Sequence, residues 1–424
     1  MPAAPSLLIV PYRSKTGKLY SQIPTSGAGD FTVTRNTEAR RFTSAGLIES
    51  VASGIPRLDY YTSGGTAGCP ALLVEPAGTN LALQSENFLT TWSPTNITVT
   101  TGSTAAFTAP DGTTTADLLT ASASGSARII QSFTFVSGTT YSYSVFAKAG
   151  SGFFGLTMEN GGVASGAAVV WNLNTGALAV SGVVGAGYTL QSQGIENYGN
   201  GWYRCRMTVL LGLGTAGNIR ANTSDGTMTS AIINSASGNT AYVWGAQLET
   251  GSVATSYIPT TAGTGSRSAD VISVSGAVSG SIGQTEGTIY VEFVNTLVAS
   301  YAEGYVYRVF ADANNEIWAR KEGGGNTYSF RWRANSQNTT FLNVAVPNGV
   351  SKIAFGYKSG DTALFLNGSQ VATTNTDVRA FSVNPTTIAL GSTSSGQFFN
   401  DRIRAVALYT TRLTNDELDT LTTL

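Results

Sequence analysis

The chain has 424 residues, of which 42% are hydrophobic and only 12% are charged, and its net charge is −1. This length predicts two or three domains, and the near-neutral charge gives no electrostatic case for binding nucleic acid. Histidine is absent, which excludes Ser-His-Asp and Cys-His catalysis and removes the commonest transition-metal ligand. Only Cys69 and Cys205 occur, too few for a disulfide framework or a cysteine zinc site. Whether these two thiols pair with each other stays open.

The composition also indicates the fold class. Glycine contributes 49 residues, and the charged share is about half of the roughly 25% that is usual in globular domains. Such a chain favours short strands joined by tight turns, so we expect an all-β protein. No apolar run approaches the roughly 18 residues of a membrane span. Residues 1–10 lack a basic segment and a full apolar segment, so we expect no signal peptide.

Residues 1–80 are irregular, with Pro, Gly and Ser between short apolar runs. Their motifs resemble the leader of many tailed-phage fibre proteins, in this order: Asp30–Arg35, Gly46–Glu49, Ile55–Tyr60, Cys69-Pro70, Leu72–Pro76, Thr79–Leu81 and Ser85–Phe88. The resemblance implies an arm or adaptor that docks to capsid or tail proteins of a virion. The alternative is a small β subdomain packed on its neighbour, and the two interpretations are compatible.

Residues 81–262 predict a β-sandwich. Tyr141–Lys148 alternates as a half-buried strand. In Gly201–Val209, Cys205 shares one face with Tyr203, Met207 and Val209, so we expect a core cysteine that acts as a small hydrophobe. Trp202, Arg204 and Arg206 lie on the opposite face and form a first candidate glycan-binding cluster.

The run Tyr242–Leu248 is apolar on both faces, which predicts a strand in the centre of a sheet. Alternation places Tyr242, Trp244, Ala246 and Leu248 on one face of that strand. The run continues into Glu249–Pro259, and the whole stretch resembles the last strand of the carbohydrate-binding, jelly-roll-like domain of phage fibre and spike proteins. The Gly-Trp-Tyr-Arg pattern at Gly201–Arg204 resembles the same domain.

Residues 263–284 are rich in Gly, Ser, Thr and Ala, and predict a linker. From residue 285 to 424 strand patterns resume. Asn367-Gly368 predicts a tight hairpin, because both residues suit positive φ angles. The strands around it resemble the concanavalin A-like lectin/glucanase jelly roll (laminin-G-like), with these motifs: Ile353–Tyr357, Leu364–Gly368, Ile388–Gly391 and Ile403–Tyr409.

One helix is predicted, at the end of the chain. Thr414 is its N-cap and Glu417 its third residue, which together make a capping box. Leu413 and Leu418 flank the cap as a hydrophobic staple.

A second candidate glycan-binding cluster lies on the strand with Tyr328, Phe330 and Trp332. These aromatic side chains share one face, and Arg331 and Arg333 point to the other. We favour the aromatic face as core. Arg331 and Arg333, together with Arg320 on the partner strand, then bind acidic groups of a polysaccharide.

Catalysis and metal binding have weaker support. A lectin-like glucanase carries Glu-x-Asp-x-(x)-Glu on one strand, and no such run occurs, so we expect no enzyme. We expect no cofactor; Asp111 and Asp117 are candidate oxygen ligands for a bound calcium ion.

The resemblances imply a phage head fibre, head spike or tail fibre that adheres to host surface glycan without catalysis. It would lie on the virion surface after synthesis in the host cytoplasm. We expect a homo-oligomer, a trimer by resemblance to fibres or a pentamer at a capsid vertex. Two alternatives remain: a purely structural or decoration protein of the virion, and a polysaccharide depolymerase.

Overall fold

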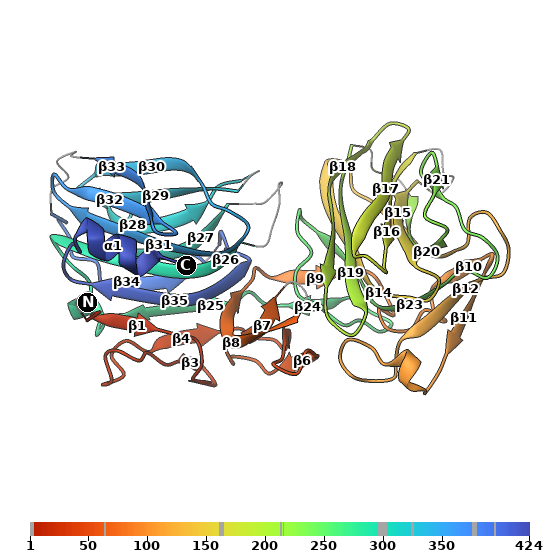
Figure 1. Cartoon of the computed structure of the whole chain (residues 1–424), viewed down its shortest axis with the longest axis horizontal. Helices are drawn as coiled ribbons and strands as arrows, with labels where there is room; N and C mark the ends of the chain where they lie inside the picture. Colours follow the sequence, from red (N-terminus) through yellow and green to blue (C-terminus); the bar gives the residue numbers. More distant parts are fainter. Residues whose placement is uncertain are drawn as a thin grey trace.

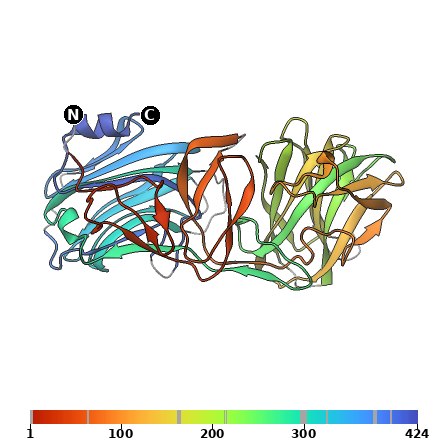
Figure 2. The same cartoon turned by 90° about the horizontal axis from the view of Figure 1, so that it is seen from below.

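The structure is a computed structural model that describes the chain except for residues 1–3, 63–64, 161–164, 213, 215, 296–302, 324–325, 375–379 and 394–395. Two β-sandwiches lie side by side along the long axis of the molecule (Figure 1). Seen from below, the N-terminal residues run along one sandwich and into the region between the two (Figure 2). The all-β prediction is confirmed, and the structure shows which strands of the chain form each sandwich.

The first sandwich, called the inserted sandwich, has its strands between Ser93 and Thr250, in two six-stranded sheets. One sheet has the order β11 (Ile97–Thr101), β12 (Asp117–Ala121), β23 (Thr240–Thr250), β14 (Thr139–Ala149), β19 (Trp202–Leu211) and β18 (Tyr188–Asn197). The facing sheet has the order β10 (Ser93–Thr95), β13 (Arg128–Thr134), β20 (Ala216–Ser224), β15 (Phe153–Glu159), β16 (Gly166–Asn172) and β17 (Ala177–Val184). Its core is made of side chains from both sheets.

The second sandwich, called the terminal sandwich, is built from both ends of the chain. Its eight-stranded sheet has the order β33 (Ser369–Thr374), β32 (Thr362–Leu366), β31 (Gly349–Lys358), β26 (Glu286–Asn295), β35 (Asp401–Tyr409), β8 (Gly65–Val74) and β7 (Leu58–Thr62), and β1 (Leu7–Ile9) pairs with β35. Its nine-stranded sheet has the order β2 (Ser14–Lys15), β3 (Lys18–Leu19), β4 (Phe31–Thr34), β25 (Val271–Ser275), β34 (Thr387–Leu390), β27 (Gly304–Asp312), β28 (Asn315–Lys321), β29 (Thr327–Ala334) and β30 (Gln337–Ala345).

Three smaller pairs complete the described strands: β5 (Ala39–Phe42) with β6 (Ile48–Val51), β9 (Gly78–Asn80) with β24 (Gly265–Arg267), and β21 (Met228–Thr229) with β22 (Ile232–Ile233). Of these, β9 and β24 matter most for the architecture. β9 leads into the inserted sandwich and β24 leads out of it, and Asn80 lies opposite Gly265 in their ladder. The inserted sandwich is therefore flanked in sequence by two strands that pair with each other.

This topology differs from the arm and the linker that the sequence predicts. Residues 1–80 are not a separate arm, because Leu7 pairs with Leu408 and Val33 pairs with Ile272 across the sheets of the terminal sandwich. Residues 263–284 are not a plain linker, because they contain β24 and β25, and β25 lies inside the nine-stranded sheet. The sequence does not show this, since strands of three to five residues carry little periodicity and their partners lie hundreds of residues away.

Strand β23 is central in its sheet, as predicted, but its faces change at Gly245. Gly245 has a φ of +64°, and the register with β14 shifts at this point. The extra residue of this β-bulge turns Ala246 and Leu248 into the core beside Val243, while Trp244 points outward. The prediction that Trp244, Ala246 and Leu248 share a face is therefore wrong, because alternation does not continue through a bulge.

The sheet that contains β23 is also buried on both faces. Tyr143 and Val145 of β14 lie in the core, and Phe146 is fully buried on the outer face. Phe42 and Tyr61, from the N-terminal residues, cover that outer face. The half-buried strand predicted over Tyr141–Lys148 is thus buried on both sides, since another part of the chain packs on it.

Several local predictions are confirmed. Cys205 is buried in the core, and Cys69 is exposed; both thiols are free. Tyr328, Phe330 and Trp332 are fully buried in the terminal sandwich. Asn367 and Gly368 have φ angles of 49° and 78°, as the hairpin between β32 and β33 requires.

Helix α1 (Asn415–Thr422) has Thr414 as its N-cap, and the capping box between Thr414 and Glu417 is present. Leu413 and Leu418 lie in one apolar cluster on the outer face of the eight-stranded sheet. No helix in the described part of the chain combines the length and the apolar character needed to cross a membrane.

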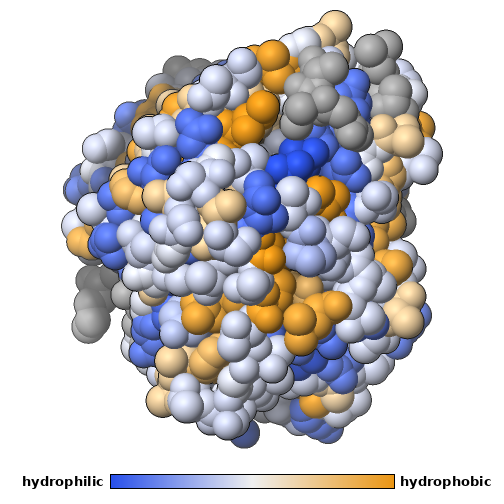
Figure 3. All heavy atoms as spheres, turned by 90° about the vertical axis from the view of Figure 1, so that its right-hand side faces the viewer, coloured by the Kyte–Doolittle hydropathy of each residue, from blue (hydrophilic) through white to orange (hydrophobic). Residues whose placement is uncertain are grey.

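The end of the inserted sandwich that points away from the terminal sandwich shows hydrophobic groups scattered among polar ones (Figure 3).

Candidate functional site

A cleft of about 490 Å³ lies where the two sandwiches and the N-terminal residues meet. Arg41 and Tyr61 come from the N-terminal residues, Tyr198 and Arg206 come from the inserted sandwich, and Arg402 comes from β35 of the terminal sandwich; all five line it. The cleft therefore exists only because the inserted sandwich is held against the rest of the chain.

Aromatic side chains form one wall of the cleft. The rings of Tyr61 and Tyr198 are 4.8 Å apart, and Tyr198 lies 4.9 Å from Phe146 and 5.5 Å from Phe42 between ring centroids. Edge-to-face and tilted arrangements of this kind are favourable for aromatic pairs. They bind the N-terminal residues to the inserted sandwich and leave half-buried Tyr198 at the cleft.

A tight turn places Tyr198 at the end of β18. Its backbone N–H donates to the carbonyl oxygen of Trp202 at 2.9 Å, and Asn197 Oδ1 accepts from Gly199 N at 2.8 Å. Asn200 has a φ of 51°, which asparagine tolerates better than most residues. The turn projects the ring of Tyr198 beyond the strand toward Tyr61.

Ion pairs order the charged side chains around this wall. Arg402 Nε lies 2.7 Å from Asp59 Oδ1, and its guanidinium carbon is 4.9 Å from the centre of the Tyr61 ring. Arg206 Nε lies 2.9 Å from Glu196 Oε1. Arginine in contact with both a carboxylate and a ring is held in one orientation, so its remaining donors keep a fixed direction.

The protonation states follow from burial and from these charges. Burial, with Glu196 nearby, raises the pKa of Tyr198 to about 12. Burial alone would lower the pKa of Arg402, but Asp59 and Asp401 raise it above its ordinary value. At neutral pH the cleft therefore presents neutral phenol groups next to permanently charged guanidinium groups.

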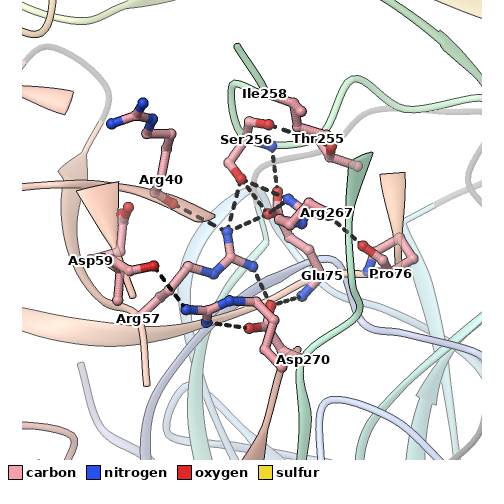
Figure 4. A network of polar contacts seen from close by, with 12 residues as sticks. Arg40, Arg57, Asp59, Glu75, Pro76, Thr255, Ser256, Ile258, Arg267 and Asp270 are labelled. Atoms are coloured by element: carbon pink, nitrogen blue, oxygen red, sulfur yellow. Dashed lines mark hydrogen bonds and ion pairs between the residues drawn. The ribbon is translucent and has the colours of Figure 1, made fainter. Parts of the chain in front are cut away.

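Beside the cleft, five buried charges connect the N-terminal residues to the segment that follows β23 (Figure 4). Arg57 pairs with Glu75 at 2.5 Å and also with Asp270, and Arg267 also pairs with Glu75. Arg35 pairs with Asp270 at 3.1 Å. Burial would raise the pKa of Glu75, but Arg267 and Arg57 hold it well below its usual range.

The segment Glu249–Pro259 is fixed by hydrogen bonds from both sides. Glu249 Oε1 accepts from Thr255 Oγ1 at 2.7 Å, and Gln247 Oε1 accepts from the backbone N–H of Ile258 at 2.7 Å. Tyr257, which lines the cleft, donates to Glu86 Oε1 at 2.8 Å. The stretch singled out in the sequence thus forms part of the cleft wall.

The first predicted cluster is divided by the structure. Arg204 and Arg206 both line the cleft. Trp202 is buried, and its Nε1–H donates to the carbonyl oxygen of Thr108 at 2.9 Å, so its ring packs inside the protein. Lys148 Nζ lies 5.1 Å from the centre of this ring.

The second predicted cluster lies on the outer face of the nine-stranded sheet and does not line the cleft. Arg320 pairs with Glu322 at 2.8 Å and with Glu303 at 3.0 Å. Arg331 lies 4.7 Å above the Trp318 ring, and Arg333 donates to the carbonyl oxygen of Ala313 at 2.8 Å. These three arginines therefore already have partners within the chain.

The two candidate calcium ligands, Asp111 and Asp117, lie in different surroundings. Asp111 is half-exposed and accepts hydrogen bonds from Thr113. Asp117 is buried and accepts from the backbone N–H of Phe88 at 2.8 Å, and burial raises its pKa to about 6. Across the described residues, no three side chains of His, Cys, Asp or Glu are grouped as a metal ion requires.

Sequence reasoning missed Tyr61, Asp59, Tyr198, Arg402 and Arg404. Local signals exist for three of them: Tyr198 stands just before the Gly-Trp-Tyr-Arg motif, and Arg402 and Arg404 are charged positions that alternate with Ile403 on a late strand. Neither signal says which faces meet, because the cleft combines residues from three distant segments.

Residues 292–419 match the family model described as the concanavalin A-like lectin/glucanases superfamily. The terminal sandwich therefore contains a lectin-like domain, as the sequence motifs predict. No curated protein matches the chain in sequence.

Solved structures that are similar to part of the chain include the CBM40 of the Ruminococcus gnavus IT-sialidase bound to α2,3-sialyllactose. It is 17% identical, covers 33% of this chain and 84% of its own, and gives a TM-score of 0.29. Domain 4 of AbnA, a GH43 extracellular arabinanase from Geobacillus stearothermophilus in complex with arabinotriose, is 14% identical, covers 36% and 73%, and gives 0.30. The receptor-binding domain of botulinum neurotoxin mosaic serotype C/D is 12% identical, covers 36% and 39%, and gives 0.30.

Proposed function

We propose that this chain is a phage fibre or spike protein of the virion surface that adheres to host surface glycan, without catalysis, through the cleft between its two sandwiches. The observation that carries the binding role is the wall of Tyr61 and Tyr198 beside the fixed guanidinium of Arg402. Concave sites that combine aromatic surface with a few oriented polar groups are typical of small-ligand binding. The phage role rests on the motif resemblances in residues 30–88 and 242–259.

The lectin-like match over residues 292–419 supports the glycan as ligand. Asn295, Arg402 and Arg404 of that matched region line the cleft, so the lectin-like domain itself supplies part of the site. The inserted sandwich supplies the remainder. Adhesion is thus proposed as a joint property of the two units.

Catalysis is not favoured by the carboxylates of the cleft. Asp59, Glu75 and Glu196 line it, and each is held in an ion pair with an arginine. A glycosidase general acid instead requires apolar surroundings that keep its proton on. A polysaccharide depolymerase would release reducing sugar from the bound glycan, which this proposal excludes.

The binding role is tested on a glycan array with the full-length protein and a Tyr198→Ala variant. We expect binding to a subset of surface polysaccharides and a loss of at least tenfold in the variant, equivalent to about 1.4 kcal/mol. Tyr12→Ala is the matched control, since Tyr12 is 53% exposed and does not line the cleft. Equal losses in both variants, or none in Tyr198→Ala, would reject the cleft as the site.

The outer face of the nine-stranded sheet is tested in the same array. An Arg331→Ser, Arg333→Ser double variant should bind as the parent does, because these residues do not line the cleft. A loss confined to this double variant would move the binding site to that face. If all variants and the parent fail to bind any glycan, the purely structural role in the virion is favoured.

Virion attachment and assembly belong to the same proposal. We propose contact with capsid or tail proteins through the terminal sandwich, which includes the N-terminal residues, and a homo-oligomeric state, with a trimer favoured over a pentamer. Immunogold labelling of purified particles tests the location, and native mass measurement tests the number of copies. Absence of label from particles, or only monomer at micromolar concentration, would contradict these parts.

A further inference from the structure

Arg204 differs from the other arginines of the cleft. Six arginines line it, and five of them have a carboxylate within ion-pair distance: Arg40, Arg41, Arg206, Arg402 and Arg404. Arg204 is the exception, because no carboxylate in the described part of the chain reaches it at that distance, although it is only 3% exposed. It is thus a buried positive charge that lines a cleft and has no carboxylate of the described residues within ion-pair distance, although Glu196, Glu249 and Glu75 act on it from farther away.

The contacts of Arg204 leave one side of its guanidinium available. Nε and Nη2 both donate to Ser144 Oγ, at 3.2 and 3.0 Å. Nη1 makes no hydrogen bond to the described residues, and it is not enclosed as the unpaired Nε atoms of Arg57 and Arg267 are. The Phe146 ring, 5.4 Å from the guanidinium carbon, holds the group in place.

Burying a guanidinium without an anion is costly. Taking one charge out of water carries a large penalty, and a neutral hydroxyl such as Ser144 offsets only part of it. Arginine does not escape this cost by losing its proton. Burial alone would lower the pKa of Arg204, but Tyr198 and Glu196 raise it above its ordinary value, so the group is charged at every physiological pH. An anionic group on the ligand would supply the direct ion pair that Arg204 lacks.

We infer that the cleft takes an acidic glycan, and that Arg204 binds one carboxylate or sulfate group of the sugar through Nη1. This inference rests on the proposed function and adds the chemical class of the glycan. The other five arginines each have a carboxylate within ion-pair distance, so Arg204 is the one arginine of the described cleft lining that has no direct ion pair, and the site selects one acidic group in the bound unit. The neutral part of the sugar would lie against Tyr61 and Tyr198.

Two matched pairs of oligosaccharides test it by calorimetry with the full-length protein. The first pair is a hexuronic-acid oligosaccharide and its carboxyl-reduced form, and the second is a sulfated oligosaccharide and its desulfated form. We expect the acidic member of at least one pair to bind at least tenfold more tightly than its neutral partner. The pair that shows the preference identifies carboxylate or sulfate. The preference should shrink as salt is added, since salt screens charge.

The variant Arg204→Gln should abolish the preference and leave the affinity for the neutral member within twofold of the parent. Arg13→Gln, an exposed arginine outside the cleft, is the control and should change neither. Thermal melting shows whether each variant is folded. If Arg204→Gln does not fold, Arg206→Gln replaces it: this change removes a 12% exposed cation and leaves Glu196 unpaired, so the preference should also fall.

The two proposals fail in different ways. Equal affinity for the acidic and neutral members in the parent, or an unchanged preference in a folded Arg204→Gln or substituted Arg206→Gln, overturns the acidic ligand but leaves glycan adhesion standing. Binding of neither member of either pair, together with a blank glycan array, overturns the proposed function and this inference with it.

Discussion

Ser256 donates two hydrogen bonds to Glu75, one from its backbone N–H at 2.7 Å and one from Oγ at 2.6 Å, although the two residues are 181 positions apart. Through this contact the segment after β23 is fixed to the residue that follows β8 and to the buried arginines Arg57 and Arg267. The junction between the two sandwiches is therefore polar and buried at once, which makes it sensitive to the loss of a single charge.

The change Glu75→Gln should destabilise the protein by about 3–5 kcal/mol, because it leaves buried arginines without their carboxylate. Chemical denaturation followed by fluorescence measures the loss, with Glu38→Gln as control since the Glu38 side chain is 58% exposed. The lowered pKa of Glu75 means that its contribution is complete above the ordinary glutamate pKa of about 4.3 and is lost as the pH falls below it. A Glu75→Gln variant as stable as the parent at pH 7 would contradict this role.

The change Asp117→Asn should stabilise the protein at neutral pH, in contrast to Glu75→Gln. Burial raises the pKa of Asp117 to about 6, so the folded state favours the protonated form, and this contribution is lost as the pH rises from about 4 to 6. Asparagine keeps an acceptor for Phe88 N–H without the charge. We expect a gain of about 1–2 kcal/mol at pH 7, less than the full shift because solvent screens part of it. The gain should vanish below pH 4; a gain that is the same at both pH values would contradict the assignment.

The change Gly245→Ala tests the bulge in β23. A β-carbon there would lie 3.0 Å from Phe146 Cδ2 and 3.3 Å from Tyr257 Cε2, on a backbone with a φ of +64°. Gly238→Ala is the control, since Gly238 has a φ of +88° and open space around it. Both variants pay the backbone cost of about 1–2 kcal/mol, but only Gly245→Ala displaces rings of the cleft. Glycan binding should weaken in Gly245→Ala alone, and equal binding by both would contradict the packing argument.

Two deletions distinguish an insertion from a string of domains. Replacing residues 81–264 by a two-residue turn joins Asn80 to Gly265, which already lie opposite each other, and should leave the terminal sandwich folded. Deleting residues 1–76 should unfold it, because six fully buried side chains are lost: Leu7, Ile9, Leu19, Phe31, Leu72 and Val74. At about 1.5–3 kcal/mol each, they match the total stability of a domain, about 5–15 kcal/mol. Circular dichroism and proteolysis check both results. A folded product of the second deletion would support the original prediction that the N-terminal residues form a separate arm.

The sequence predicts well those features whose signals are local. The capping box at Thr414 and Glu417, the turn at Asn367-Gly368 and the inward aromatic face at Phe330 all depend on neighbours within a few residues. The bulge at Gly245 is also local, but a single glycine in a strand does not state whether the alternation shifts.

The candidate site depends on contacts that no local pattern shows. Arg204 and Arg206 could be predicted as outward-facing, since they alternate with Cys205. What lies opposite them could not, because Tyr61 and Arg402 reach the cleft only after β8 pairs with β35 and the inserted sandwich folds back. The charge balance that distinguishes Arg204 appears only when these partners are in place.

The paired strands β9 and β24 also bear on how such a protein can diversify. The strands at the two ends of the inserted sandwich are neighbours in one ladder. Genetic recombination at these strands could therefore exchange the inserted sandwich as a cassette without moving any other strand. Each exchange would replace the cleft residues Tyr198 and Arg204 and would keep the cleft residues Tyr61 and Arg402. One part of the cleft lining would then change in a single genetic event, and the other part would be inherited.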